Sequence, residues 1–139
     1  MLVAIAGADT LGAIEASARL SASRGRLLVV EDEWLISTHL SEYLQELGYD
    51  VVGPASTIAE AVFLAGRAPI DAALVDLSLG GVLAIDVIDA LVKRGIPFVF
   101  VTGFSAMPEG VHYDAPVVEK PFKSDELISA IEGVLASRR

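Results

Sequence analysis

Short, uninterrupted apolar runs recur along this chain and are separated by segments with helical spacing. The runs lie within residues 27–30, 50–53, 72–75, 98–101 and 117–119. Runs of valine, leucine and similar residues without polar alternation are typical of strands buried on both faces of a parallel sheet. Between the runs, apolar residues recur every three or four positions, which indicates amphipathic helices. The pattern therefore predicts five strand–helix units in succession.

Helix boundaries are predicted from the residues that flank the apolar spacing. Gly48 is suited to end the first helix, and Gly95 the third. Thr57 and Glu60 have the spacing of a capping box at the start of the second helix. The last helix is predicted to begin at Ser124, with two acidic residues in its first turn. The inward face of the first helix is predicted to comprise Ile36, Leu40, Tyr43, Leu44 and Leu47.

One connection departs from this regular alternation. Residues 105–116 contain Pro108 and Gly110, so only a short or mobile helix is expected there. With right-handed crossovers, the whole pattern predicts an α/β fold of the flavodoxin-like (βα)5 type, a doubly wound parallel sheet with strand order 2-1-3-4-5. The domain is assigned to residues 26–139, and residues 1–25 form an N-terminal extension that is expected to be flexible or loosely helical.

Composition narrows the class of protein. The chain has 139 residues, no cysteine and a net charge of −9. Disulfides and thiolate metal sites are excluded, and the lack of cysteine favours a cytoplasmic protein. The negative charge argues against a nucleic-acid partner but suits a basic docking face on a protein. No apolar run approaches the ~20 residues of a membrane span, and no membrane association is expected.

The N-terminal extension offers no recognisable site. Gly7 and Gly12 have the spacing of a phosphate-binding loop, but the Lys–Ser/Thr pair of that motif is missing. There is no basic segment of the kind that begins a signal peptide. Apolar residues such as Leu11 and Ile14 suit packing on the domain or on a second copy of the chain, which leaves a homodimer open.

Polar residues follow four of the five apolar runs directly. Glu31 and Asp32 follow the first run, Asp76 the third, Thr102 the fourth and Lys120 the fifth. The carboxyl ends of parallel strands meet at one edge of the sheet, where open α/β sheets bind ligands. Three carboxylates, an amine and a hydroxyl in one cleft suit a hard divalent cation together with a phosphoryl group.

Each of these residues also has a simpler interpretation. Glu31 and Asp32 suit the N-terminus of a helix, Asp76 suits a turn, and Lys120 suits a solvated loop. Their joint occurrence at four strand ends favours a site. His39 and His112 have no neighbours at metal-ligand spacing and are interpreted as structural or solvent-facing. Trp34 is interpreted as a packing residue or a partner contact.

Four motifs, taken together, resemble the receiver domain of two-component response regulators. They are Val-Glu-Asp-Glu at 30–33, Val-Asp-Leu-Ser-Leu-Gly at 75–80, Val-Thr-Gly at 101–103 and Glu-Lys-Pro-Phe at 119–122. The resemblance extends from residue 26 to about residue 137. It implies a signalling phosphoacceptor that catalyses only its own phosphorylation and dephosphorylation, and a sensor histidine kinase or a histidine phosphotransfer protein as its partner.

The resemblance also implies a role for each matching residue. Asp76 is the implied phosphoacceptor, and Mg²⁺ is the implied cofactor. Asp32 is the implied direct ligand, Glu31 acts through water, and the backbone carbonyl of Ser78 completes the protein ligands.

The remaining matching positions would handle the phosphoryl group. Lys120 would pair with Asp76 before transfer and with phosphoryl oxygens after it, and Thr102 would hydrogen-bond a phosphoryl oxygen. Pro121 matches a proline that follows this lysine in a cis peptide bond in the family.

One departure from the common receiver pattern and two similarities to particular receivers concern the output of the signal. Val117 stands where many receivers carry an aromatic switch residue three positions before the lysine. Phe-Val-Thr-Gly-Phe at 100–104 resembles a subset of stand-alone receivers, and residues 47–55 are similar to receivers linked to stress signalling. Gly103 and Phe104 are therefore expected to carry the switch.

No output domain follows the last predicted helix, so a single-domain response regulator is expected. A receiver cut from a larger regulator is the alternative within the family. A small Mg²⁺-dependent phosphatase of the haloacid-dehalogenase kind is the alternative from another class, and it is disfavoured because Ser78 breaks the Asp-x-Asp pattern after Asp76. A scaffold that has lost phosphorylation is disfavoured because all five site residues are present.

Overall fold

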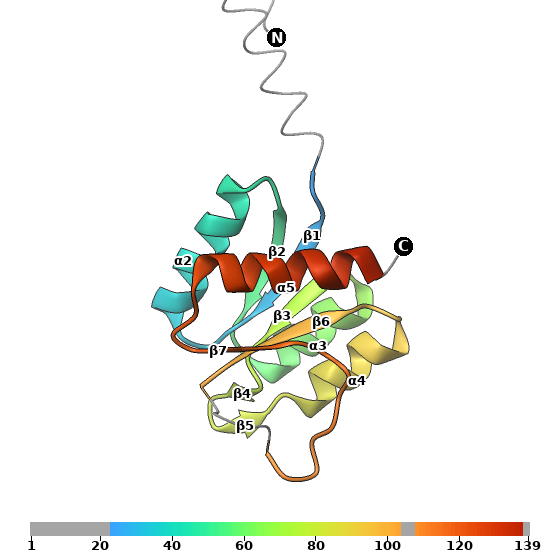
Figure 1. Cartoon of the computed structure of the whole chain (residues 1–139). Coiled ribbons are helices and arrows are strands. Elements are labelled where there is room, and N and C mark those ends of the chain that lie inside the picture. The colour runs from blue at the N-terminus through green and yellow to red at the C-terminus, as the bar shows by residue number, and fades with distance from the viewer. Residues whose placement is uncertain (1–22, 104–107, 138–139) are drawn as a thin grey trace, which may run out of the picture.

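A five-stranded parallel sheet forms the centre of the chain, with the order β2-β1-β3-β6-β7 (Figure 1). The computed structural model describes residues 23–103 and 108–137. Expectations for the N-terminal extension up to residue 22 and for Phe104 lie outside the described residues. The predicted strand order is confirmed. The strands are β1 (Arg26–Val30), β2 (Asp50–Ala55), β3 (Ala72–Val75), β6 (Phe98–Thr102) and β7 (Val117–Glu119).

Alternating side chains of the buried strands pack in two separate hydrophobic cores, one on each face of the sheet. Leu27 and Val29 of β1 face the core under helices α2 (Trp34–Glu46) and α5 (Ser124–Ser137), whereas Leu28 and Val30 face the core under α3 (Ile58–Arg67) and α4 (Ile85–Lys93). Figure 1 shows α5 crossing in front of the strands and α3 behind them. Both faces of the sheet are therefore covered, as the unalternating apolar runs predict.

Helix α2 differs from its predicted face. Its buried residues are Ser37, Leu40, Ser41 and Leu44, so the predicted Leu40 and Leu44 are joined on the buried face by two serines and not by Ile36 and Tyr43. Ile36 and Tyr43 are left half-buried at the edge of the helix.

The other helices begin and end close to the predicted positions. The Thr57 side chain accepts a hydrogen bond from the Glu60 backbone N–H at 3.2 Å, which confirms the predicted cap of α3. Helix α4 ends at Lys93, just before Gly95, and α5 begins at Ser124. Among residues 23–103 and 108–137, no helix combines the length and apolar character that crossing a membrane requires.

The connection between β6 and β7 corrects the expectation of a short helix for residues 108–116, whereas residues 105–107 lie outside the described part of the chain. Residues 108–116 contain no helix. Gly110 has a φ of +84°, which a right-handed helix does not accommodate. The segment is held instead by Tyr113, whose ring packs edge-on against Phe98 at 6.1 Å and is tilted against Phe100 at 6.0 Å. Packing of an aromatic side chain replaces helical hydrogen bonds here.

A small antiparallel hairpin was not anticipated from the apolar pattern. It consists of β4 (Ser78–Leu79) and β5 (Val82–Leu83), joined by Gly80 and Gly81. Both glycines have positive φ, +56° and +82°, as a two-residue hairpin turn of this kind requires. The hairpin fills the connection between β3 and α4, next to the carboxyl end of the sheet.

Contacts of the domain reach two residues before the first strand. The Arg24 backbone N–H donates to the Gly48 carbonyl at 3.0 Å, and its guanidinium forms an ion pair with Glu132 at 3.0 Å. The same guanidinium lies over the Tyr49 ring, 4.7 Å from its centre. Arg24 therefore ties the start of β1 to α5 and to the α2–β2 turn.

Candidate functional site

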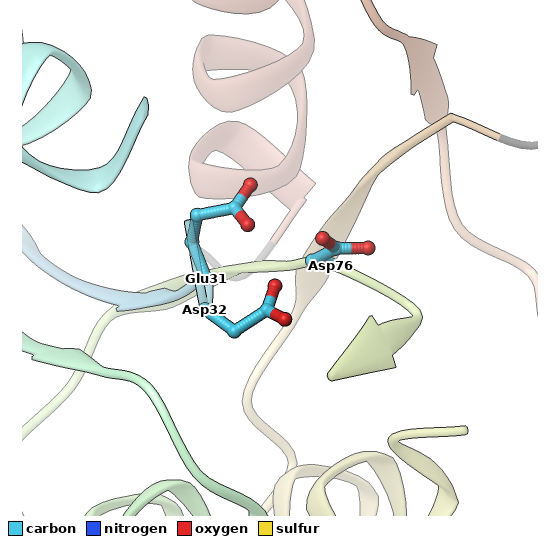
Figure 2. A group of neighbouring side chains, drawn as sticks. All are labelled: Glu31, Asp32 and Asp76. Carbon is cyan, nitrogen blue, oxygen red and sulfur yellow. The ribbon is translucent and has the colours of Figure 1, made fainter. Parts of the chain in front are cut away.

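The strand pairing brings three carboxylates together. Val30 pairs with Val75 at the carboxyl ends of β1 and β3, so the residues that follow, Glu31 and Asp76, emerge side by side. Together with Asp32, they present one carboxylate oxygen each within 4.8 Å of the other two. Figure 2 shows the three side chains leaving two neighbouring strand ends. Their convergence follows directly from the parallel topology.

Lys120 reaches this cluster from β7, two strands away from β3. Its backbone N–H donates to the Thr102 carbonyl at 2.8 Å, which fixes the position of its main chain. Its Nζ lies 2.5 Å from Glu31 Oε1 and 3.0 Å from Asp76 Oδ2. The following bond, Lys120–Pro121, is cis, as the resemblance implies. One amine thus bridges two of the three carboxylates.

Burial divides the acidic residues into two kinds. Glu31 and Asp76 are only 3% and 7% exposed, whereas Asp32 is exposed to solvent. Burial raises the pKa of Glu31 to about 7, although the hydrogen bond from Lys120 acts against the increase. Keeping these buried carboxylates ionised therefore destabilises the folded domain, and a cation in addition to Lys120 would offset this cost.

The pKa values of Asp32 and Lys120, the other two shifted groups of the site, favour the charged forms. The hydrogen bond from the Gly80 backbone holds the pKa of Asp32 below its ordinary value. Burial works to lower the pKa of Lys120, but hydrogen bonds to Glu31 and Asp76 outweigh it, so the pKa is raised. An ammonium and an ionised Asp32 are therefore the resting forms at neutral pH.

Backbone N–H groups complete the hydrogen bonding of the carboxylates. The N–H of Ser78 donates to Asp76 Oδ1 at 3.1 Å, and that of Gly80 donates to Asp32 Oδ2 at 2.9 Å. The N–H of Glu33 donates to Glu31 Oε2 at 3.1 Å. Each carboxylate is thus oriented by one main-chain donor.

The acidic cluster opens into a cavity of ≈ 330 Å³. Thr102, the last residue of β6, is buried and lines this cavity next to Gly103. The structure therefore brings Glu31, Asp32, Asp76, Ser78, Thr102, Gly103 and Lys120 into one place. Phe104, the other predicted switch residue, lies outside the described part of the chain.

Two residues of the site were missed from the sequence. Glu33 lines the cavity, and its carboxylate is 3.9 Å from Lys120 Nζ. Gly80 contributes the backbone donor to Asp32 described above. The glycine pair after Leu79 is a hairpin signal that was available in the sequence, whereas nothing in the pattern separated Glu33 from its acidic neighbours.

A larger groove of ≈ 550 Å³ adjoins the acidic cavity and shares Glu33 and Lys120 with it. Its other walls are mostly apolar and come from α2 and from the loop that leads into α5. His39 lies on this groove, and Trp34 is 75% exposed among the described residues. The residues that line only this groove are Ile36, His39, Leu40, Tyr43, Pro121, Phe122 and Ser124.

The donor set fits a hard divalent cation. Carboxylate oxygens that share one Mg²⁺ lie at most about 4.2 Å apart, because each Mg–O bond is about 2.1 Å. A spread of up to 4.8 Å admits such an ion with small adjustments or with one ligand acting through water. The described residues of the cluster offer oxygen ligands only, which favours Mg²⁺ over softer metals.

The comparisons with known proteins define the class of this protein. The family model for the response regulator receiver domain matches residues 27–132. The chain therefore belongs to the receiver-domain family of response regulators, which acts in signalling.

Individual relatives agree with this assignment. The chain is 38% identical over 113 residues to the transcriptional regulatory protein PdtaR of Mycobacterium tuberculosis, and the match covers 77% of this chain and 55% of PdtaR. The chain thus spans about half the length of that curated relative. The solution structure of SdrG from Sphingomonas melonis is 39% identical, with a TM-score of 0.68, and the match covers 79% of this chain and 95% of SdrG. The receiver domain of PhyR from Erythrobacter litoralis is 25% identical, with a TM-score of 0.73, and the match covers 84% and 93%.

Proposed function

We propose that the chain is a phosphoacceptor of a two-component system and that Asp76 takes the phosphoryl group. The observation that carries the proposal is the position of Asp76. Its side chain is buried, accepts a hydrogen bond from Lys120 Nζ at 3.0 Å and lies in a cluster with Glu31 and Asp32. An Asp76 carboxylate oxygen forms a bond to phosphorus while the phosphorus–nitrogen bond of a phosphohistidine breaks. The imidazole leaves, and an acyl phosphate remains on Asp76.

The other residues serve positioning and charge neutralisation, which dominate phosphoryl transfer. Asp32, Asp76, the Ser78 carbonyl and, through water, Glu31 would hold Mg²⁺, and the bound ion would neutralise charge on the transferred group. Lys120 would shift from the carboxylates to a phosphoryl oxygen. Thr102 would donate its hydroxyl to another phosphoryl oxygen from the cavity wall.

The partner in this proposal is a sensor histidine kinase or a histidine phosphotransfer protein in the cytoplasm. The apolar groove along α2 supports docking there, because it shares Glu33 and Lys120 with the acidic cavity. Trp34 and Leu35, both exposed at the start of α2, extend the apolar surface. A helix seated on this groove would bring a phosphohistidine within reach of Asp76. We propose that the output is a phosphorylation-dependent change of protein contacts at Gly103 and Phe104.

The direct test is phosphorylation by a small acyl phosphate or phosphoramidate with Mg²⁺ present. Intact-mass spectrometry is expected to show one added phosphate on the wild type and none on Asp76→Ala. Asp71→Ala is the matched control, because Asp71 flanks the other end of β3. It is expected to accept phosphate like the wild type. An undiminished adduct on Asp76→Ala would refute the assignment.

A further inference from the structure

The β4–β5 hairpin contacts two of the clustered carboxylates, although they follow different strands. At its base, the Ser78 N–H donates to Asp76; at its tip, the Gly80 N–H donates to Asp32. The first bond spans two residues of sequence, but the second spans 48. A single short hairpin therefore sets the position of Asp32 relative to Asp76.

Asp32 needs such support more than its neighbours do. Glu31 and Asp76 are buried and bonded to Lys120, whereas Asp32 is exposed and lies at the solvent side of the cluster. An exposed carboxylate ordinarily samples several rotamers. The bond from Gly80 favours one orientation of the Asp32 carboxylate.

The hairpin itself is anchored on both sides of its turn. Leu77 and Leu79 are buried in the core under α3 and α4. The Ala84 N–H donates to the Leu77 carbonyl at 2.7 Å, which closes the base of the hairpin. The turn between these anchors has two residues only, Gly80 and Gly81, so its tip has little freedom to move away from Asp32.

We propose that the Gly80–Gly81 turn is a positioning element for cation binding, and that its first N–H holds Asp32 in the orientation that a divalent cation requires. This inference rests on the proposed function, because it concerns the same site. Pre-organised ligands bind more tightly, since the cost of ordering them has already been met in the free protein. Cation affinity therefore depends on the length of a turn that provides no ligand of its own.

The first test examines the bond without any cation. Hydrogen exchange of the Gly80 amide is measured by NMR in the metal-free wild type and in Asp32→Ala. Exchange at Gly80 is expected to become at least about tenfold faster in the variant, while the buried amides of β1 and β3 keep their protection. Equal exchange at Gly80 in both proteins would overturn the inference.

The second test changes the length of the turn. Insertion of two glycines between Gly80 and Gly81 moves the tip away from Asp32, and Mg²⁺ affinity measured by calorimetry is expected to fall about tenfold. The same insertion after Gly95, a positive-φ turn residue between α4 and β6, is the matched control and is expected to leave the affinity within twofold.

The outcomes separate the two proposals. The positioning role is overturned if the Gly80 insertion variant binds Mg²⁺ as tightly as the wild type. It is also overturned if the Gly95 insertion lowers the affinity by the same factor. Either result leaves the phosphoacceptor function intact. If the wild type binds no Mg²⁺, the proposed function itself is contradicted, and the positioning role for cation binding falls with it. Thermal unfolding of both insertion variants verifies that the domain remains folded.

Discussion

Two aspartates border the four residues of strand β3, and they do different things. Asp71 precedes the strand, and its Oδ2 accepts the backbone N–H of Arg26 at 2.7 Å, which joins the amino ends of β3 and β1. Asp76 follows the strand and lies among Glu31, Asp32 and Lys120. The same type of side chain is thus a structural acceptor at one edge of the sheet and a buried member of a carboxylate cluster at the other.

The difference shows how charge is distributed between the two edges. At the amino edge, Arg24 pairs with Glu132 in the open, where ion pairs have little effect on stability in either direction. At the carboxyl edge, the two buried carboxylates of Glu31 and Asp76 share the ammonium of Lys120, and an imbalance of charge in this partly buried place is costly. The residues that join the strands and those of the proposed site thus lie at opposite edges of the sheet. The following variants test whether the two edges act separately.

The largest effect is expected from Lys120→Ala in the absence of divalent cations. Its removal leaves the buried carboxylates of Glu31 and Asp76 without a cationic partner, so the free energy of unfolding is expected to fall by about 3 kcal/mol. Urea unfolding in EDTA measures the loss, and Mg²⁺ is expected to restore much of it, because a cation compensates the same carboxylates. Lys123→Ala, an exposed neighbour, is the control and should change little. Equal stability of the two variants would contradict the buried cluster.

Glu31→Gln is expected to change how stability depends on pH. The pKa of Glu31 is raised from 4.5 to about 7 in the folded state. The folded protein therefore binds this proton more tightly than the unfolded chain does, and that stability is present below pH 4.5 and lost as the pH rises through about 7. The metal-free variant should lack this loss. Between pH 4.5 and pH 8, its free energy of unfolding should therefore rise relative to that of the wild type by about 3 kcal/mol. Parallel stability curves would refute the shift.

Asp71→Ala is expected to have a smaller effect and only on stability. It removes the acceptor of one hydrogen bond, so a loss of about 1 kcal/mol in the free energy of unfolding is expected. Phosphate uptake at Asp76 should be unchanged in the folded fraction. A large fall in uptake without a fall in stability would show that the two edges are not separate.

The smallest effect is expected from Arg24→Ala, with a loss of at most about 1 kcal/mol, because both partners of its ion pair are exposed to solvent. Chemical unfolding of the full chain measures it, and Arg67→Ala, whose guanidinium lies over Phe63, is a matched control. A loss several times larger would place the residues before β1 in the core of the domain.

The sequence was informative where one interaction dominates. Buried strands must be continuously apolar, so the five runs predicted the sheet, and parallel pairing then required Glu31 and Asp76 to emerge together. It was less informative where interactions compete. Tyr113 packs on Phe98 and Phe100, and residues 108–116 form no helix; such tertiary contacts override weak local preferences.

Two other features depend on geometry that spacing alone does not encode. The buried face of α2 includes Ser37 and Ser41, which an argument from apolar periodicity passes over. The hydrogen bond from Gly80 to Asp32 joins positions 48 residues apart. Its donor is a backbone N–H, so no pattern of side chains predicts it.

The edges of the sheet have a consequence for association between chains. Strand β2 lies at one edge and contains Pro54, which has no N–H to offer to an added strand, and the register of β1 against β2 is irregular between Leu28 and Val30. Strand β7 forms the other edge and has only three residues. Edges that are short or interrupted discourage growth of the sheet by a second molecule. Copies of this domain that meet at high concentration are therefore expected to associate through helices or loops, and not by extending the sheet into fibrils.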